Sequence, residues 1–163
     1  MSLALGGAAL DQTVAHAAEN EAKSESKGAS AKNTVYGELG GPGLIYSINY
    51  ERGIGDFNIR VGVGGAAVNT GGYLAIPVGF NYMGIGGDKH HLELGITGNT
   101  FVVFGGGSDA AFILSPIAGY RLQPRDGGFN FRAGLSPYVF GTGGGVTNGG
   151  FIPMPYVSFG ASF

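Results

Sequence analysis

The sequence contains no cysteine and no tryptophan, and its 163 residues include only nine basic and eleven acidic side chains. Without cysteine, the chain has no disulfide, no thiolate ligand for a metal and no thiol nucleophile. The net charge of −2 provides no basic stripe of the kind that binds nucleic acids. No apolar run reaches the roughly 18 residues that a transmembrane helix needs. The function classes that remain depend neither on thiol chemistry nor on nucleic acids.

Glycine is abundant instead, with 34 copies, which is about three times its usual share of about 7%. It does not recur with the Gly-X-Y period of collagen. It disfavours long helices, because each interior glycine costs about 1 kcal/mol relative to alanine. The hydrophobic fraction of 44% is too high for a disordered chain. Composition therefore predicts a single all-β domain.

The first 33 residues differ from the rest in composition. Residues 1–17 are small and fairly apolar and end in Ala-His-Ala, the small-x-small pattern of a secretory cleavage site, although Asp11 interrupts them. We interpret them either as the remnant of a signal peptide or as a flexible leader. Residues 18–33 alternate Glu and Lys with small residues and cannot bury enough surface to offset the entropy of ordering. They are predicted to form a disordered polar tail, which leaves residues 34–163 as the domain.

From residue 34 onward, large apolar residues alternate with small or polar ones, which is the period of a β-strand. In one segment Phe57, Ile59 and Val61 take one face, and Asn58 and Arg60 take the other. This pattern indicates strands with two chemically different faces. Turn-forming sequences separate seven such segments, at residues 53–56, 69–72, 84–88, 105–109, 123–128 and 141–150.

The first segment, residues 34–52, contains a change of face. Its apolar residues move from odd to even positions, with Val35 and Leu39 before the change and Leu44, Tyr46, Ile48 and Tyr50 after it. Because a shift of one residue reverses the face that a side chain meets, residues 40–43 form either a β-bulge or a tight turn. As a turn, they divide the segment and raise the total to eight strands.

The face opposite the large apolar residues carries mostly Gly, Ala, Ser and Asn. A soluble β-protein covers its outer face with Lys, Glu, Thr and Gln, but the only lysine after Asn33 is Lys89, at a turn. Small residues suit the inside of a narrow barrel whose large residues face lipid, and closure removes unpaired strand edges. We therefore predict an all-β fold, an antiparallel up-and-down transmembrane β-barrel of eight strands. The alternative is a soluble, glycine-rich β-sandwich.

Six charged residues fall within strands, and the alternation places all of them on the small and polar face. They are three acids and three bases, and five of them lie near one end of the predicted barrel, where charge-assisted hydrogen bonds can join them. Because a single buried charge is costly, we interpret them as a paired plug, with a gated pore or ligand site as the alternative. The six residues of this predicted lumen charge network are Glu38, Glu51, Arg60, Glu93, Arg121 and Arg132.

Six aromatic residues flank the connections at 53–56, 84–88 and 123–128, or the C-terminus, and all fall on the large apolar face. Aromatic residues gathered at one level of a barrel are typical of an interfacial girdle. The predicted girdle consists of Tyr50, Phe57, Tyr82, Tyr120, Phe129 and Phe163. Proline removes a hydrogen-bond donor from a strand. Most of the following prolines are therefore expected near the outer ends of strands, with bulges there: Pro77, Pro116, Pro137, Pro153 and Pro155.

Candidate catalytic residues are few. His90 and His91 are adjacent in a strand and therefore point to opposite faces, which makes them a poor metal pair. The glycine clusters at 105–107 and 143–145 precede neither Lys-Ser/Thr nor a helix, so they are not phosphate-binding loops. We expect no catalytic site, no metal and no cofactor.

The chain ends with apolar residues at every second position and a terminal aromatic: Val157, Phe159, Ala161 and Phe163. This ending resembles the C-terminal assembly signal of outer-membrane barrels of Gram-negative bacteria. Residues 34–163 resemble the OmpA/OmpX-type eight-stranded barrels in size and strand count. They also resemble uncharacterised small outer-membrane barrels that carry Tyr-Ser-x-Asn-Tyr-Glu-Arg, here Tyr46–Arg52, and Gly-Tyr-Arg-x-Gln-Pro, here Gly119–Pro124.

The resemblance implies a bacterial outer membrane as the location, with both termini and the connections at 53–56, 84–88 and 123–128 in the periplasm. Expected partners are the lipid bilayer, the assembly machinery acting on the last strand, and a protein partner at the lipid face or rim. The expected function is structural or partner-binding, including that of an accessory subunit of a larger complex. A porin-like narrow channel for small or apolar solutes is the alternative, because Gly, Ala and Ser line much of the predicted outer lumen. An outer-membrane lipid-modifying enzyme is a weaker alternative, because no His-x-Ser follows the histidine pair.

Overall fold

The structure, a computed structural model, describes residues 32–105, 109–143, 146–147 and 150–163. The predicted leader at 1–17 and all but the last two residues of the predicted tail lie outside these ranges. The described chain contains no helix that is long and apolar enough to cross a membrane. Its elements are β1 (Asn33–Gly40), η1 (Gly41–Gly43), β2 (Tyr46–Ile54), β3 (Phe57–Val68), β4 (Gly71–Gly86), β5 (His90–Phe104), β6 (Asp109–Leu122), β7 (Gly128–Leu135), β8 (Phe140–Gly143), β9 (Val146–Thr147) and β10 (Pro155–Ser162).

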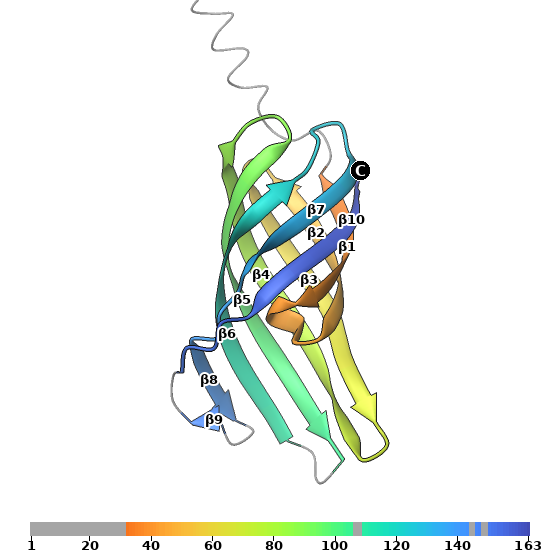
Figure 1. Ribbon diagram of the computed structural model, residues 1–163, viewed down its shortest axis with the longest axis vertical. Helices are drawn as coiled ribbons and strands as arrows, with labels where there is room; N and C mark the ends of the chain where they lie inside the picture. Colours follow the sequence, from red (N-terminus) through yellow and green to blue (C-terminus); the bar gives the residue numbers. More distant parts are fainter. Residues whose placement is uncertain (1–31, 106–108, 144–145, 148–149) are drawn as a thin grey trace, which may run out of the picture.

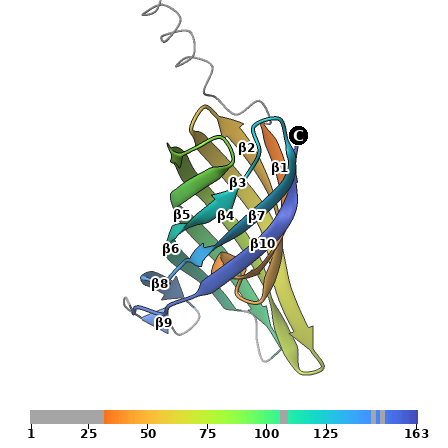
Figure 2. The same cartoon turned by 45° about the horizontal axis from the view of Figure 1, so that its top comes forward.

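All strands belong to one antiparallel sheet that closes on itself. Neighbours follow the order β5-β4-β3-β2-β1-β10-β7-β6-β8-β9, and a β5–β6 pairing closes the ring (Figures 1 and 2). β7 and β8 both pair with β6, one after the other, and so act as two halves of one long strand. β9 pairs with β8 and β10 pairs with β7, so β9 and β10 likewise act as two parts of the eighth strand. The predicted eight-stranded antiparallel barrel is therefore confirmed.

The barrel has two ends, which we call the terminal rim and the far rim. The terminal rim carries the C-terminus and the turns β2–β3, β4–β5 and β6–β7, and the far rim carries the β3–β4 turn and the last residues of β5 and first residues of β6 (Figure 1). At the terminal rim the ends of the barrel are joined, because the Asn33 N–H donates to the Phe163 carbonyl and the Phe163 N–H donates to the Asn33 carbonyl. The last strand thus completes the wall beside the first.

Burial alternates along every long strand, with the polarity of a soluble protein reversed. In β2, Ser47 and Glu51 are buried while Tyr46, Ile48 and Tyr50 are exposed. Among the described residues, polar and charged side chains outnumber hydrophobic ones in the buried set, and large hydrophobic side chains are exposed on every side of the barrel. The strand period predicts this result, because successive side chains point to opposite faces of the sheet.

The connection at 40–43 is a turn and not a β-bulge. β1 ends at Gly40, whose φ of +75° suits glycine, and η1 follows with all three of its residues buried. Leu44 then adopts φ 69° and ψ −82°, with the Ile45 N–H donating to the Gly43 carbonyl, which is a strained γ-turn. Its side chain packs inside the barrel, so the prediction that Leu44 belongs to the outer apolar face is wrong.

Proline positions follow gaps in the hydrogen-bond ladders. Pro77 lies within β4 opposite a stretch of β3 that lacks ladder pairs, and Pro116 lies within β6 opposite the interval between β7 and β8. Pro137 lies in that interval, and Pro155 begins β10. Because these sites need no N–H donor from proline, the sheet stays closed without edges at these points. The expectation that prolines gather near strand ends is wrong for Pro77 and Pro116.

Candidate functional site

The six charged residues singled out from the sequence all lie inside the barrel, and each is at most 1% exposed. They come from six strands, so the barrel wall brings together residues that are far apart in the chain. We call this group the charge network: Glu38, Glu51, Arg60, Glu93, Arg121 and Arg132. β5 carries Glu93 near the terminal rim, which places the network in that half of the barrel.

Four members of the charge network form one cluster. Arg132 donates to Glu93 through Nε at 2.8 Å and through Nη2, a two-pronged contact that matches guanidinium to carboxylate. Arg121 lies 2.5 Å from Glu51 and 3.4 Å from Glu93, and Arg132 approaches Glu51 at 3.6 Å. Each arginine therefore bridges both carboxylates, and the buried charges of these four side chains cancel.

The remaining pair is linked to the cluster by a tyrosine. Arg60 donates to Glu38 at 2.8 Å and to Asn49 at 3.1 Å. The Tyr36 ring lies between two guanidinium groups, with the Arg132 Cζ atom 4.4 Å and the Arg60 Cζ atom 5.7 Å from its centroid. Both contacts are within the range of a cation–π interaction. Tyr36 therefore contacts both the Arg60–Glu38 pair and the four-residue cluster that contains Arg132.

Sequence reasoning missed two aromatic members of this layer, Tyr36 and Tyr156. Both are buried, and the Tyr156 hydroxyl donates to Glu93 at 3.5 Å. The signal was present, because Tyr36 shares its parity with Glu38 and Tyr156 shares its parity with Ser158.

Interior glycines make room for these long side chains. A Cβ atom added to Gly79 would lie 2.9 Å from Arg60 Cγ and 2.6 Å from Thr97 Oγ1, closer than real Cβ contacts come. A Cβ atom on Gly134 would lie 2.9 Å from the Tyr156 hydroxyl. The small residues of the inner face therefore provide volume for arginine and tyrosine.

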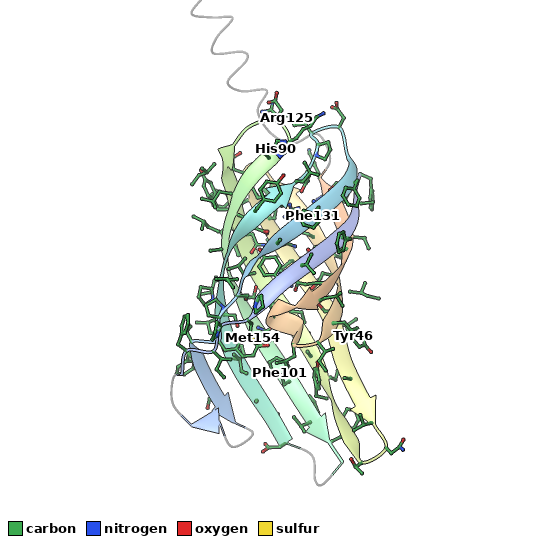
Figure 3. The ribbon with its side chains drawn as sticks, in the orientation of Figure 1. Tyr46, His90, Phe101, Arg125, Phe131 and Met154 are labelled. Atoms are coloured by element: carbon green, nitrogen blue, oxygen red, sulfur yellow. The ribbon has the colours of Figure 1, made fainter. Side chains whose placement is uncertain are left out.

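Aromatic side chains occupy the interior farther toward the far rim. Phe101 and Tyr138 are buried with Ala75 and Ala111, and Tyr73 packs against them; Figure 3 shows Phe101 beside Met154 in this half of the barrel. We call this group the aromatic cluster: Leu44, Tyr73, Ala75, Phe101, Ala111, Ile113, Tyr138 and Met154. The sequence-based expectation of an outer lumen lined by Gly, Ala and Ser missed its aromatic side chains, because they are scattered among small residues.

The six predicted girdle residues lie at the terminal rim, where Tyr82 is half-buried and the others are exposed. Phe57 contacts Phe80 and Tyr82, with ring centroids 5.1 Å apart in both cases. Phe131, which Figure 3 places below His90, continues the aromatic surface toward Phe159 at 5.3 Å. Exposed aromatic residues also occur toward the far rim, which the sequence analysis did not single out: Tyr46, Phe104, Phe112, Phe140 and Phe151.

The histidine pair lies at the terminal rim. His90 Nδ1 and the Tyr120 hydroxyl are 2.6 Å apart, and the rings are in contact. The turns beside them hold an ion pair of 2.8 Å between Arg125 and Asp88. Within the described ranges, no three His, Asp or Glu side chains are grouped as metal ligands.

β10 holds Val157, Phe159 and Ala161 of the predicted assembly signal in register with both neighbours, and Phe163 follows the strand. Val157 pairs with Leu39 of β1 and with Ala133 of β7. Phe159, Ala161 and Phe163 are exposed on the outer face, and Val157 is half-buried. Any factor that binds this strand from the outside before closure would therefore meet these side chains.

Comparisons with protein-family models, with curated proteins and with solved structures give no match for this chain. The function must therefore be argued from the barrel itself. Its features are an apolar exterior, a paired charge network, an aromatic cluster and two rims of different construction.

Proposed function

We propose that this protein is an integral β-barrel of a bacterial outer membrane, with a closed interior and a structural or partner-binding role. The observation that carries the proposal is the reversed polarity of the barrel. Soluble monomers rarely expose a contiguous apolar patch larger than a few hundred Å². Here Ile48, Val61, Val78 and Leu94, from four successive strands, all present large apolar side chains to the outside.

Strand length and aromatic placement support the membrane location. A tilted membrane strand needs about 9–11 residues; β2 to β6 have between 9 and 16, whereas β1, β7 and β10 have eight each. Exposed aromatic residues lie toward both rims, as in barrels whose apolar band is flanked by two aromatic girdles. The described N-terminal end and the C-terminus share the terminal rim, which matches the periplasmic placement that the family resemblance implies.

The contents of the barrel favour a closed interior over a channel. The charge network fills the terminal half with paired side chains, and the aromatic cluster with the buried η1 turn fills much of the other half. An eight-stranded barrel is just wide enough for side chains to fill it. A barrel of this kind acts through its outer wall and rims, so a structural element or accessory subunit is the role it fits best.

The first experiment compares the gel mobility of unboiled and boiled protein extracted in detergent. A closed membrane barrel stays folded in SDS and changes mobility on boiling. Solubility without detergent, together with unchanged mobility, would contradict the membrane location of the barrel.

The second experiment measures conductance across planar bilayers. The closed interior predicts no steady open level for the wild-type protein. A steady open level that Glu93→Ala abolishes would instead support the narrow channel. The matched control is Asp88→Ala, which changes an exposed carboxylate at a turn outside the charge network.

A further inference from the structure

The last part of β3, toward the far rim, has a neighbouring strand on one side only. β2 makes its last pair with β3 at Ser47 and Gly64, whereas β3 continues to Val68 and pairs with β4 along residues 64–68. Within the described ranges, no other strand lies beside residues 65–68 of β3. Figures 1 and 2 show the β3–β4 hairpin extending well past the end of the β1–β2 hairpin. In this part of the barrel β3 is therefore an edge strand.

The β1–β2 connection is held away from this edge by its own contacts. The Tyr138 hydroxyl donates to the Gly41 carbonyl at 3.0 Å, and the Tyr73 hydroxyl donates to the Gly43 carbonyl at 3.2 Å. The Ile45 N–H donates to the Tyr73 hydroxyl at 3.0 Å. Because these bonds hold the connection toward the inside of the barrel, it does not continue β2 along the edge of β3.

The edge presents backbone groups that can pair with another strand. A strand in an antiparallel sheet directs its N–H and C=O groups alternately to its two sides, so about half of those in residues 65–68 point away from β4. Native proteins commonly protect such edges with charged side chains or proline. Residues 65–68 are Gly-Ala-Ala-Val and contain neither. The edge is therefore chemically open to strand addition.

In the membrane location proposed above, this edge lies at the limit of the apolar band. β3 begins at Phe57 in the predicted girdle, and a tilted strand crosses the hydrocarbon in about 9–11 residues, which ends the crossing at about residues 65–67. The exposed Tyr46 and Phe104 lie beside the edge, as interfacial aromatic residues do. Open sheet edges are not tolerated within hydrocarbon. At this level, a partner in water can reach the edge.

We propose that residues 65–68 of β3 bind an extended segment of a partner protein as an added, antiparallel β-strand. The added strand takes the place beside β3 that β2 leaves, so that the two lie end to end. The same fold already uses this arrangement, because β7 and β8 lie one after the other along β6. A strand satisfies the unpaired backbone groups of the edge, which a hydrocarbon chain cannot. This site specifies the partner-binding role proposed above and rests on it.

A groove of about 350 Å³ beside the edge indicates which side chains the added strand carries. Gly65 and Ala67 face outward in this groove, and its lining includes the larger Val63, Leu74 and Phe104 but no charged residue. Side chains of directly opposite residues lie together on one face of an antiparallel pair. Large apolar residues opposite Gly65 and Ala67 therefore fill the groove. The partner segment is expected to alternate large apolar residues with small ones.

A second copy of this chain is a poorer fit to the edge. Two copies inserted in the same direction bring their β3 strands together in parallel, whereas every strand pairing in the described part of the chain is antiparallel. A segment of another protein can approach β3 in the antiparallel direction that β2 already has.

The test uses the full-length protein in detergent micelles and a fluorescein-labelled octapeptide in which leucine alternates with serine. The matched control is the same peptide with N-methylated amides, which keeps the side chains but cannot donate backbone hydrogen bonds. We expect the octapeptide to bind, as measured by fluorescence anisotropy, and to protect residues 65–68 from hydrogen exchange. The N-methylated peptide should bind at least roughly tenfold more weakly.

A substitution in the groove locates the bound peptide. Ala67→Phe fills the groove and should weaken binding of the octapeptide by roughly tenfold, because a leucine side chain loses its buried position. Val61→Phe is the matched control, since Val61 lies on the outer face of the same strand and pairs with both neighbours. It should leave binding unchanged.

Equal binding of the two peptides would overturn strand addition, because backbone hydrogen bonds would then contribute nothing. Binding that Ala67→Phe leaves unchanged would place the peptide elsewhere and overturn the site. Protection of residues 65–68 that rises with protein concentration in the absence of peptide would assign the edge to a second copy and also overturn the proposal. The gel-mobility shift of the same samples tests the membrane barrel separately, so protein that shifts on boiling but binds no peptide overturns the strand site alone.

Discussion

At the scale of single residues, the interior is stabilised by pairing. Removing one partner from a buried ion pair leaves an uncompensated charge, which costs about 3–5 kcal/mol, whereas replacing the whole pair is often neutral. Arg132 has the most contacts in the charge network, since it touches Glu93, Glu51 and the Tyr36 ring. It is therefore the residue whose loss should cost most.

We expect Arg132→Met to lower the free energy of unfolding by about 3–5 kcal/mol, because Glu93 and Glu51 lose a shared cation. Urea titration of the detergent-folded protein, followed by gel mobility, measures this loss. The double variant with Glu93→Gln should regain part of it, since the charges inside balance again. A double variant no more stable than Arg132→Met would contradict the pairing argument.

Two buried tyrosine hydroxyls make a matched comparison. The Tyr138 hydroxyl donates to the Gly41 carbonyl, whereas the Tyr36 hydroxyl finds no hydrogen-bond partner within the described ranges. Tyr138→Phe should therefore lower the free energy of unfolding by about 1 kcal/mol, while Tyr36→Phe should leave it unchanged or raise it. The same urea titration tests both variants. Equal losses for the two would show that the hydroxyl of Tyr138 contributes nothing to the inward turn.

At the scale of elements, closure depends on the last strand. β10 pairs with β7 along its whole length and with β1 from Tyr156 to Ser162, whereas β9 pairs only with β8 among the described residues. A strand with neighbours on both sides opens rarely, and one with a single neighbour opens by local unfolding. The barrel is therefore tightest beside the terminal rim and weakest at the β8–β9 hairpin.

Hydrogen exchange should show the same order of local stability, with β10 more protected than β8 and β9. Amides of β10 that face β1 and β7 should exchange close to the rate of global unfolding, and those of β8 and β9 should exchange much faster. Mass spectrometry of protein in detergent micelles, digested after exchange, compares the two regions. Equal protection of the two regions would show that the β8–β9 hairpin has a partner outside the described chain.

Substitution of Phe163 can distinguish an effect on assembly in the cell from an effect on the stability of the folded barrel. If the assembly machinery recognises the last strand, as the resemblance implies, Phe163→Ala should reduce the amount of folded protein in cell membranes several-fold. Refolding in detergent should be almost unaffected, because the Phe163 side chain is exposed. Phe129→Ala, at the same rim but outside the last strand, is the control. An equal loss of membrane protein for both variants would contradict a specific signal.

At the scale of the whole molecule, apolar residues stabilise the outside and ion pairs the inside. Screening acts on exposed charges, and the Debye length falls from about 10 Å at 0.1 M salt to about 3 Å at 1 M. The charge network is buried, so salt has little access to it. On the outer surface of the barrel, large apolar side chains are exposed instead.

We therefore expect the free energy of unfolding in a non-ionic detergent to change little between about 0.1 and 1 M sodium chloride. The measurement is a urea titration at both salt concentrations, with Asp88→Ala as a control for the exposed pair with Arg125. A loss of several kcal/mol at high salt would indicate that the charge network is open to solvent.

The sequence by itself determined which face of each strand is apolar and where most of the turns lie. Those properties follow from local geometry, because side chains alternate along a strand and turns need particular residues. The change of parity across residues 40–43 was compatible with a turn or with a β-bulge, and the structure showed the turn that makes the eighth strand. The charged residues were found for the same reason, since each shares its parity with the small residues around it.

Only the tertiary structure decided how these residues meet. Arg132 contacts Glu93 across 39 positions, and Tyr138 contacts Gly41 across 97 positions. Such contacts depend on register and closure, which no local pattern specifies. The inward η1 turn and the division of the seventh and eighth strands arise in the same way. They reflect where neighbouring strands end relative to one another, and that is fixed when the sheet closes.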